Sequence, residues 1–189
     1  MNKSAQTSVP INPLISNRWS PRSFDLDKEV NHDDLLAILE AGRWAPSANN
    51  LQPWKFTVGV RGDEVFEKIA STLADFNKLW APNSSAMILI SAEVMKSDGS
   101  PIHTALYDAG IAASLMTMEA TSRGLHTHQM AGFDRTAMKE AFDLGKNFRH
   151  VAVLVIGTLA PADLLTDALK ERETAERSRK SLSQISNFH

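Results

Sequence analysis

The spacing of apolar and polar positions along the chain matches helices in some segments and strands in others. Residues 11–17 are expected to form a short helix. Asn31 has the side chain of a helix N-cap, and apolar residues at helical spacing follow it, so a helix is predicted that ends before Pro46. Residues 54–60 (WKFTVGV) alternate between apolar and polar side chains and predict a strand.

The rest of the chain continues this alternation of helical and extended patterns. The further elements expected are a helix over 63–79, a strand over 86–94, a helix over 101–124, a strand over 126–130, a helix over 134–142, a strand over 149–158 and a helix from about residue 161. Strands that alternate with helices predict an α+β or α/β fold, in which helices cover a central sheet.

The helix expected over residues 101–124 has an unusual pattern, because its apolar side chains lie on nearly every face. Leu106, Ile111, Leu115 and Met118 are examples, with small residues between them. A helix that is apolar all round must be buried on all sides. We therefore expect this helix either at the centre of the fold or between two subunits of a dimer.

Composition narrows the class of protein. With 189 residues and 43% hydrophobic side chains, the chain suits a single domain over 1–189. A net charge of −2 excludes the general basic field of a non-specific nucleic-acid binder. The absence of cysteine excludes disulfides, thiolate catalysis and cysteine-ligated metals. Without a signal-peptide pattern or an apolar run of spanning length, a cytoplasmic protein is expected, with residues 1–9 flexible.

Several common catalytic and cofactor motifs are missing from the sequence. The chain has no dinucleotide-binding glycine motif after a strand, no P-loop, no HEXXH and no GXSXG. His126 and His128 could share one side of a strand, but no further metal ligands can be identified beside them. We interpret both as structural histidines and predict no metal site.

Two short stretches carry candidate chemistry. RWSPRSF, residues 18–24, holds Arg18, Ser20 and Arg22, a combination of fixed positive charge and hydroxyl donor suited to an anion. By itself such a stretch is more often a solvated turn, or a phosphorylation site, than a cofactor site. RWAPSANNLQPWKF, residues 43–56, stiffens a loop with two prolines and offers amide and hydroxyl groups that could meet a flat heteroaromatic ring.

Taken with later segments in the same order, these stretches resemble the nitroreductase family of FMN-dependent oxidoreductases. The later segments are FNKLW at 76–80, DAGIAASLM at 108–116, SRGL at 122–125 with AGFD at 131–134, and RSR at 177–179. The resemblance implies an α+β sandwich with a mostly antiparallel sheet. It also implies an intertwined homodimer with two FMN sites at the interface and a C-terminal arm over 175–189.

The resemblance further implies which residues contact FMN. These are Arg18, Trp19, Ser20, Arg22, Pro46, Ser47, Ala48, Asn50, Gln52, Asn77, Ala131, Gly132, Arg177 and Arg179. Arg18, Ser20 and the two late arginines would hold the phosphate, and Arg22 would lie beside N1 and the C2 carbonyl of the ring. The backbone of residues 131–132 would approach N5 and O4. Since the chemistry is carried by the flavin, no catalytic side chain is predicted.

The activity implied is transfer of hydride from NADH or NADPH, through flavin N5 and in ping-pong order, to an electron-poor acceptor such as a nitroaromatic or quinone. The alternative is an FMN-binding protein without reductase turnover, which stores, delivers or consumes flavin. A structural domain without a cofactor, and reductive dehalogenation, are further alternatives that the sequence leaves open.

Overall fold

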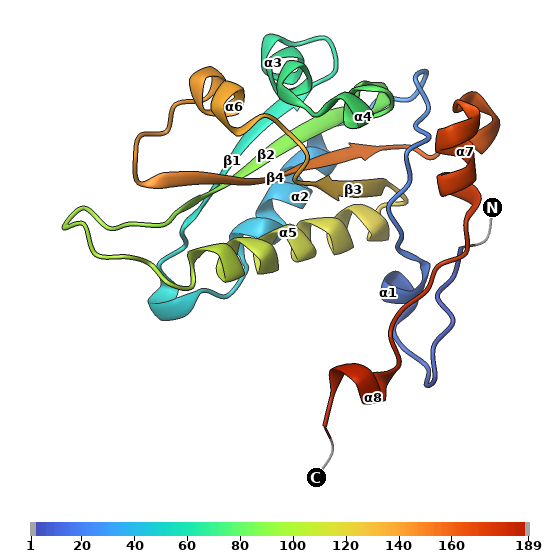
Figure 1. Cartoon of the computed structure of the whole chain (residues 1–189), viewed down its shortest axis with the longest axis horizontal. Helices are drawn as coiled ribbons and strands as arrows, with labels where there is room; N and C mark the ends of the chain where they lie inside the picture. The colour runs from blue at the N-terminus through green and yellow to red at the C-terminus, as the bar shows by residue number, and fades with distance from the viewer. Residues whose placement is uncertain (1–2, 188–189) are drawn as a thin grey trace.

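The computed structural model describes residues 3–187 and contains a single four-stranded sheet (Figure 1). Its strands are β1 (Trp54–Val60), β2 (Ala86–Glu93), β3 (His126–Met130) and β4 (Phe148–Gly157). The order across the sheet is β1-β2-β4-β3, and each neighbouring pair is antiparallel. β2 and β4 are therefore central, which explains why seven of the eight residues of β2 are buried.

Helices cover both faces of this sheet, which confirms the α+β expectation. The α-helices are α1 (Pro13–Asn17), α2 (His32–Arg43), α3 (Glu64–Thr72), α4 (Asp75–Lys78), α5 (Ala105–Ser122), α6 (Arg135–Ala141), α7 (Asp167–Thr174) and α8 (Leu182–Ile185), and short 3-10 turns occupy Ala48–Asn50, Ala81–Asn83 and Ala162–Leu164. α2 and α5 pack on one face, while α3, α4 and α6 lie on the other.

The two faces of the sheet produce two hydrophobic clusters. Ile88, Ile90 and Leu154 point into the cluster shared with α2 and α5. Met87 and Val155 point into the other cluster, beneath α3 and α6. Neighbouring residues of a strand face opposite sides of the sheet, and so a short chain builds both clusters from the same two central strands.

Local signals in the sequence located several element boundaries correctly. The Asn31 side chain accepts a hydrogen bond from the Asp34 amide at 2.7 Å and caps α2, as predicted. The strand expected over 54–60 has those bounds in the structure. The strands expected over 86–94 and 149–158 differ from the observed ones by one residue at one or both ends.

The single helix expected over 63–79 is wrong, because the chain forms two helices with an extended break at Leu73 and Ala74. Leu73 makes an isolated β-bridge with Phe133, and the Ala74 amide donates to the Gly132 carbonyl at 2.9 Å. The apolar spacing continues through the break, so periodicity could not reveal it. The break sets α4 beside residues 132–134.

Helix α5 is buried on one side only within the chain. Ala109, Ala112 and Met116 face the sheet and are inaccessible to solvent. On the opposite side Tyr107 is 73% exposed and Leu115 is 36% exposed. Of the two positions expected for this helix, enclosure at the centre of a single chain is therefore wrong.

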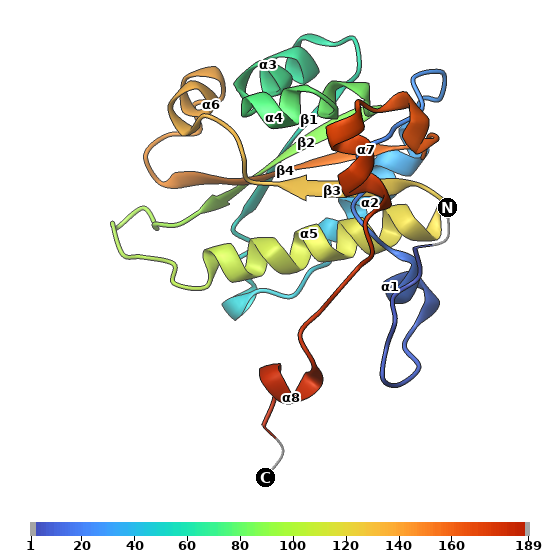
Figure 2. The ribbon, with the colours of Figure 1, turned by 45° about the vertical axis from the view of Figure 1, so that its right-hand side comes forward.

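The first and last described segments of the chain contact each other, through hydrogen bonds that join Lys3 and Ser16 to residues 173–177. Residues from Ala175 onwards leave the body as an extended segment that carries α8, and this segment passes beside α1 (Figures 1 and 2). The flexible region expected over 1–9 and the arm expected over 175–189 each include two residues outside the described range. No helix between residues 3 and 187 is both long and apolar enough to cross a membrane.

Candidate functional site

Three arginines from distant parts of the sequence meet near α1. Arg18 directly follows α1, and its Nη1 donates to Ser20 Oγ at 3.3 Å. Burial lowers the pKa of Arg18 below its ordinary value, and the charges of Arg177 and Arg179 lower it further. Within residues 3–187, none of the three pairs with a carboxylate. The cluster is thus a group of converging, uncompensated positive charges.

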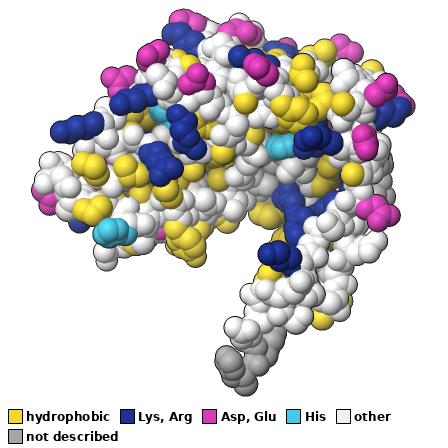
Figure 3. Space-filling model, in the orientation of Figure 1, with side chains coloured by type: hydrophobic (Ala, Val, Ile, Leu, Met, Phe, Trp, Pro, Cys, Tyr) yellow, Lys and Arg dark blue, Asp and Glu magenta, His cyan; other side chains and the backbone are white. Residues whose placement is uncertain are grey.

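The late arginines reach this cluster because the chain termini are tied together. Arg177 Nη1 donates to the carbonyls of Lys3 and Ser16, at 2.5 and 2.8 Å. Lys3 Nζ in turn donates to the carbonyls of Glu173 and Ala175, both at 2.5 Å. Figure 3 shows Lys and Arg side chains in the hollow between the body and the C-terminal segment.

A cleft of about 260 Å³, lined mainly by polar residues, opens beside Arg18 and Ser20. Its other walls come from α5 and β3 and consist of Ser114, Thr117, Met118, Thr127 and Gln129. Gln129 Nε2 donates to Thr117 Oγ1 at 3.0 Å, which joins the two walls. Hydroxyl and amide groups along one cleft, with the Arg18 guanidinium in its wall, suit a polyhydroxylated anion.

Arg22 lies deeper, above a stack of aromatic rings. Its guanidinium carbon is 6.0 Å from the centre of the Trp80 ring, and that ring is 4.5 Å from the ring of His128. Burial lowers the pKa of His128 to about 4, so the imidazole is neutral at pH 7. Arg22 Nε and Trp80 Nε1 are buried, and neither has a hydrogen-bond partner among the described residues. Two hydrogen-bond donors beside the Trp80 ring are therefore unpaired.

Asn77 and Gly132 form the next part of the same face. Asn77 Nδ2 donates to the Gly132 carbonyl at 2.9 Å. A Cβ at position 132 would lie 2.7 Å from that nitrogen, so a larger residue there would displace the Asn77 side chain. Both residues are near the surface, and the Asn77 carbonyl accepts from the amide of Trp80, the residue whose ring lies below Arg22, at 3.2 Å.

The loop over residues 46–52 is held in an unfavourable backbone conformation. Within the described chain, the non-glycine residues with positive φ are Asn49, Asn50 and Gln52, all in this loop. Such conformations cost energy and are concentrated at functional sites. The Asp108 carboxylate is buried in the first turn of α5 and accepts from the Ala48 amide at 3.2 Å.

The predicted site residues therefore form two groups that one chain does not bring together. Arg18 and Ser20 lie beside the second half of α5, whereas the loop contacts Asp108 near its start. The axial distance between Asp108 and Thr117 is about 14 Å, from a rise of 1.5 Å per residue.

Trp19 is buried beneath Lys3, whose Nζ is 4.9 Å from the ring centre.

Sequence reasoning missed three residues that organise this region. Glu173 accepts hydrogen bonds from the Arg22 and Ser23 amides, Asp108 supports the loop, and Gln129 lines the cleft. Glu173 and Asp108 are among the few buried charged side chains. The neighbours of Glu173 in sequence give no signal of burial, since it lies in a polar helix, whereas Asp108 lies in the apolar helix that was expected to be buried.

Comparisons with known proteins agree with this arrangement. The model of the nitroreductase family matches residues 15–79 and 62–158. A crystal structure described as an oxidoreductase containing FMN is 34% identical, covers 99% of this chain and 95% of its own, and superimposes with a TM-score of 0.91. The chain therefore belongs to the nitroreductase family, as the motifs predicted.

Two curated relatives extend the comparison. An uncharacterized 15.4 kDa protein in the ask 5′ region of Mycolicibacterium smegmatis is 37% identical over 142 residues, covering 69% of this chain and 92% of its own length. A protein of Bacillus subtilis strain 168, provisionally named NAD(P)H nitroreductase YdgI, is 26% identical over 186 residues, covering 79% of this chain and 88% of its own.

Proposed function

We propose that this protein is an FMN-dependent oxidoreductase that uses NAD(P)H to reduce an electron-poor acceptor, such as a nitroaromatic, a quinone or a related electrophile. The observation that carries the proposal is the convergence of Arg18, Arg177 and Arg179 beside a polar cleft without a compensating carboxylate. Membership of the nitroreductase family, and the relative described as containing FMN, support the same function.

The cationic cluster fits the phosphate end of FMN. A phosphate monoester carries nearly two negative charges at pH 7, and planar guanidinium groups bind its oxygens with paired donors. Arg18, Arg177 and Arg179 would neutralise that charge, and Ser20 would add a hydroxyl donor. The mutual repulsion that lowers the pKa of Arg18 would be relieved by the bound anion.

The ring end of the cofactor fits the second part of this face. The unpartnered Nε of Arg22 would donate to the N1 and C2 carbonyl edge, where a fixed positive charge stabilises a reduced ring. Asn77 and the backbone of residues 131–132 would border N5 and O4. When bound, FMN would supply two-electron hydride chemistry between NAD(P)H and the acceptor, in ping-pong order. The chain itself would bind, orient and shield the flavin, and we assign no side-chain acid or base.

The loop over 46–52 would complete the site from a second subunit. In an isologous dimer about an axis near the middle of α5, the loop of one copy would come beside the cleft of the other. Pro46, Ser47, Ala48, Asn50 and Gln52 would then line the ring. The exposed side of α5 supports this homodimer, because Tyr107 and Leu115 would be covered.

The proposal treats residues 1–189 as one FMN-binding domain and residues 175–189 as an arm that crosses to the partner. Leu182 and Ile185 are 52% and 66% exposed in the single chain, which supports burial of this arm elsewhere. We place the protein in the cytoplasm, where nicotinamide co-substrates are available.

The decisive experiment is the visible absorption spectrum of the purified protein before and after anaerobic NADPH or NADH. Yellow protein whose flavin bands bleach, and return when a quinone or nitroaromatic is added, is the expected result. Yellow protein that does not bleach would instead identify a flavin carrier without turnover. Protein that neither carries nor takes up FMN would contradict the proposal.

A further inference from the structure

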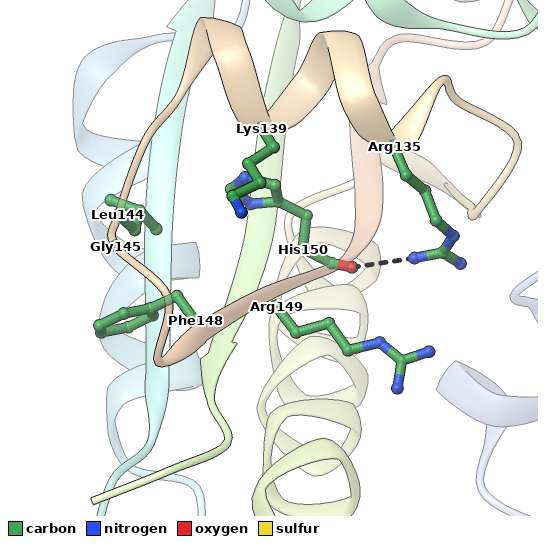
Figure 4. A pocket seen from close by; sticks show the side chains of 7 residues that line it. All are labelled: Arg135, Lys139, Leu144, Gly145, Phe148, Arg149 and His150. Atoms are coloured by element: carbon green, nitrogen blue, oxygen red, sulfur yellow. Dashed lines mark hydrogen bonds between the residues drawn. The ribbon is translucent and has the colours of Figure 1, made fainter. Parts of the chain in front are cut away.

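A second cationic pocket lies outside the proposed FMN site, between α6 and the start of β4. It has a volume of about 210 Å³ and is lined by Arg135, Lys139, Leu144, Gly145, Phe148, Arg149 and His150 (Figure 4). Lys and Arg side chains gather over α6 and the start of β4 on the same face as the first cluster (Figure 3). No ion pair in residues 3–187 involves Arg135, Lys139 or Arg149.

The pocket has two chemically different sides. In Figure 4, Leu144 and Phe148 lie on one side, while the guanidinium groups of Arg135 and Arg149 extend on the other. Arg135 is held in place, since Nη1 donates to the His150 carbonyl at 3.4 Å and its guanidinium carbon is 5.4 Å from the centre of the Phe133 ring. An apolar wall beside positively charged side chains fits a ligand that joins a flat ring to an anion.

Two titratable groups beside the pocket, Asp143 and His150, are engaged in hydrogen bonds of their own. The Asp143 carboxylate accepts from the Gly145 amide at 2.8 Å and belongs to the turn before β4. His150 Nδ1 is hydrogen-bonded to Ser91 Oγ at 2.8 Å. Burial lowers the pKa of His150, while a hydrogen bond with the Phe142 backbone opposes that effect. The permanent cations are therefore Arg135, Lys139 and Arg149, enough to bind a phosphate dianion.

The position of the pocket suits one end of a long co-substrate. Met130 pairs with Val153 at the end of β3, next to the residues proposed to border flavin N5. From Val153 to Arg149, β4 extends about 13 Å at 3.3 Å per residue. A dinucleotide whose nicotinamide lies near the flavin could place its adenosine over this distance, whereas a small electrophile could not span it.

We propose that Arg135, Lys139 and Arg149 bind the adenosine 2′-phosphate of NADPH, with Phe148 and Leu144 against the adenine, so that the enzyme prefers NADPH to NADH. NADH lacks this phosphate and would leave the three cations unpaired. The inference rests on the proposed function, because it assigns the co-substrate of that reaction.

Binding can be measured without turnover. Isothermal titration calorimetry of the purified protein should show adenosine 2′,5′-bisphosphate bound at least tenfold more tightly than 5′-AMP. Arg149→Gln and Lys139→Gln should each weaken the bisphosphate by roughly tenfold, as loss of one charge-assisted contact predicts. Lys96→Gln, at an exposed lysine in the loop before α5, is the control and should change nothing. Equal affinity for the two nucleotides, or competition by inorganic phosphate at the same concentration, would overturn the proposal.

Steady-state kinetics provide the second measurement. The ratio of kcat/KM for NADPH to that for NADH should fall about tenfold in Arg149→Gln, through the KM for NADPH, and should stay at the wild-type value in Lys96→Gln. Failure of the proposed function can be distinguished from failure of this inference. Colourless protein without FMN would contradict the proposed function, and calorimetry would still test nucleotide binding in the pocket. Yellow protein that both nucleotides reduce with equal kcat/KM would overturn only this inference.

Discussion

Glu173 and Arg22 are 151 residues apart in sequence, and the carboxylate of the first holds the backbone of the second. The Arg22 amide donates to Oε1 and Oε2 of Glu173 at 3.0 and 2.9 Å, and the Ser23 amide donates to Oε1 at 3.2 Å. The Arg22 guanidinium completes the contact with an ion pair of 3.9 Å. α7 thereby fixes the segment that carries Arg18, Ser20 and Arg22.

Replacing this carboxylate should destabilise the fold. Glu173→Ala leaves the buried Ser23 amide and the half-buried Arg22 amide without an acceptor, and we expect the free energy of unfolding to fall by about 2 kcal/mol or more. Urea denaturation measures this change. Glu171→Ala, two residues away on the exposed side of α7, is the matched control. If both variants lost the same stability, the carboxylate of Glu173 would have no special role.

Arg18→Ala should separate cofactor binding from folding. Removing one of three repelling guanidinium groups should leave the stability of the flavin-free protein unchanged or slightly higher. FMN affinity should fall by about 10- to 100-fold, the value of one charge-assisted phosphate contact. Fluorescence titration with FMN and thermal unfolding of the flavin-free form measure the two effects. Lys28→Ala, at an exposed lysine, is the control, and full FMN affinity in Arg18→Ala would exclude the phosphate role.

Asp108 should control the loop over 46–52. In Asp108→Ala the Ala48 amide and the Thr104 hydroxyl lose their acceptor, at a cost of about 2 kcal/mol. Hydrogen exchange of the Ala48 amide should become faster than in the wild type. Asp108→Asn keeps one oxygen acceptor and should restore part of the protection. An Ala48 amide that exchanges at the same rate in all three proteins would argue against this support.

The exposed side of α5 predicts the oligomeric state. If it is the dimer interface, Leu115→Glu should place two charges in a desolvated contact and shift the protein to monomers. Light scattering after size-exclusion chromatography measures the mass directly. Leu164→Glu introduces the same charge at a leucine that is 72% exposed in a different part of the molecule, and it should stay dimeric. A Leu115→Glu protein with the wild-type mass would place the interface elsewhere.

His128 predicts a loss of stability in mild acid. Its pKa is about 4 in the fold and near 6.5 in the unfolded chain, so between these values only the unfolded state takes up the proton. Stability should therefore decrease as pH falls from 6.5 to 4, by up to roughly 3 kcal/mol for this residue. His128→Gln should show a weaker pH dependence in urea denaturation. In the wild type, the imidazole NMR signal should not titrate between pH 7 and 5.5; titration near 6.5 would disprove the assigned environment.

Much of the local structure follows from short-range information. The Asn31 cap, the alternating strand over 54–60 and the order of the family motifs could all be predicted, because caps, strand alternation and motifs depend on residues a few positions apart. The cationic stretch around Arg18 was also visible in the sequence.

Only the tertiary structure decided the break at Leu73 and Ala74, the exposure of one side of α5, and the contact of Glu173 with Arg22. Each depends on groups far apart in the chain, and a helical pattern is the same whether or not a distant segment interrupts the helix. The sequence alone thus determined the family and the polar groups available to it. Packing determined which of those groups meet and which remain without a partner.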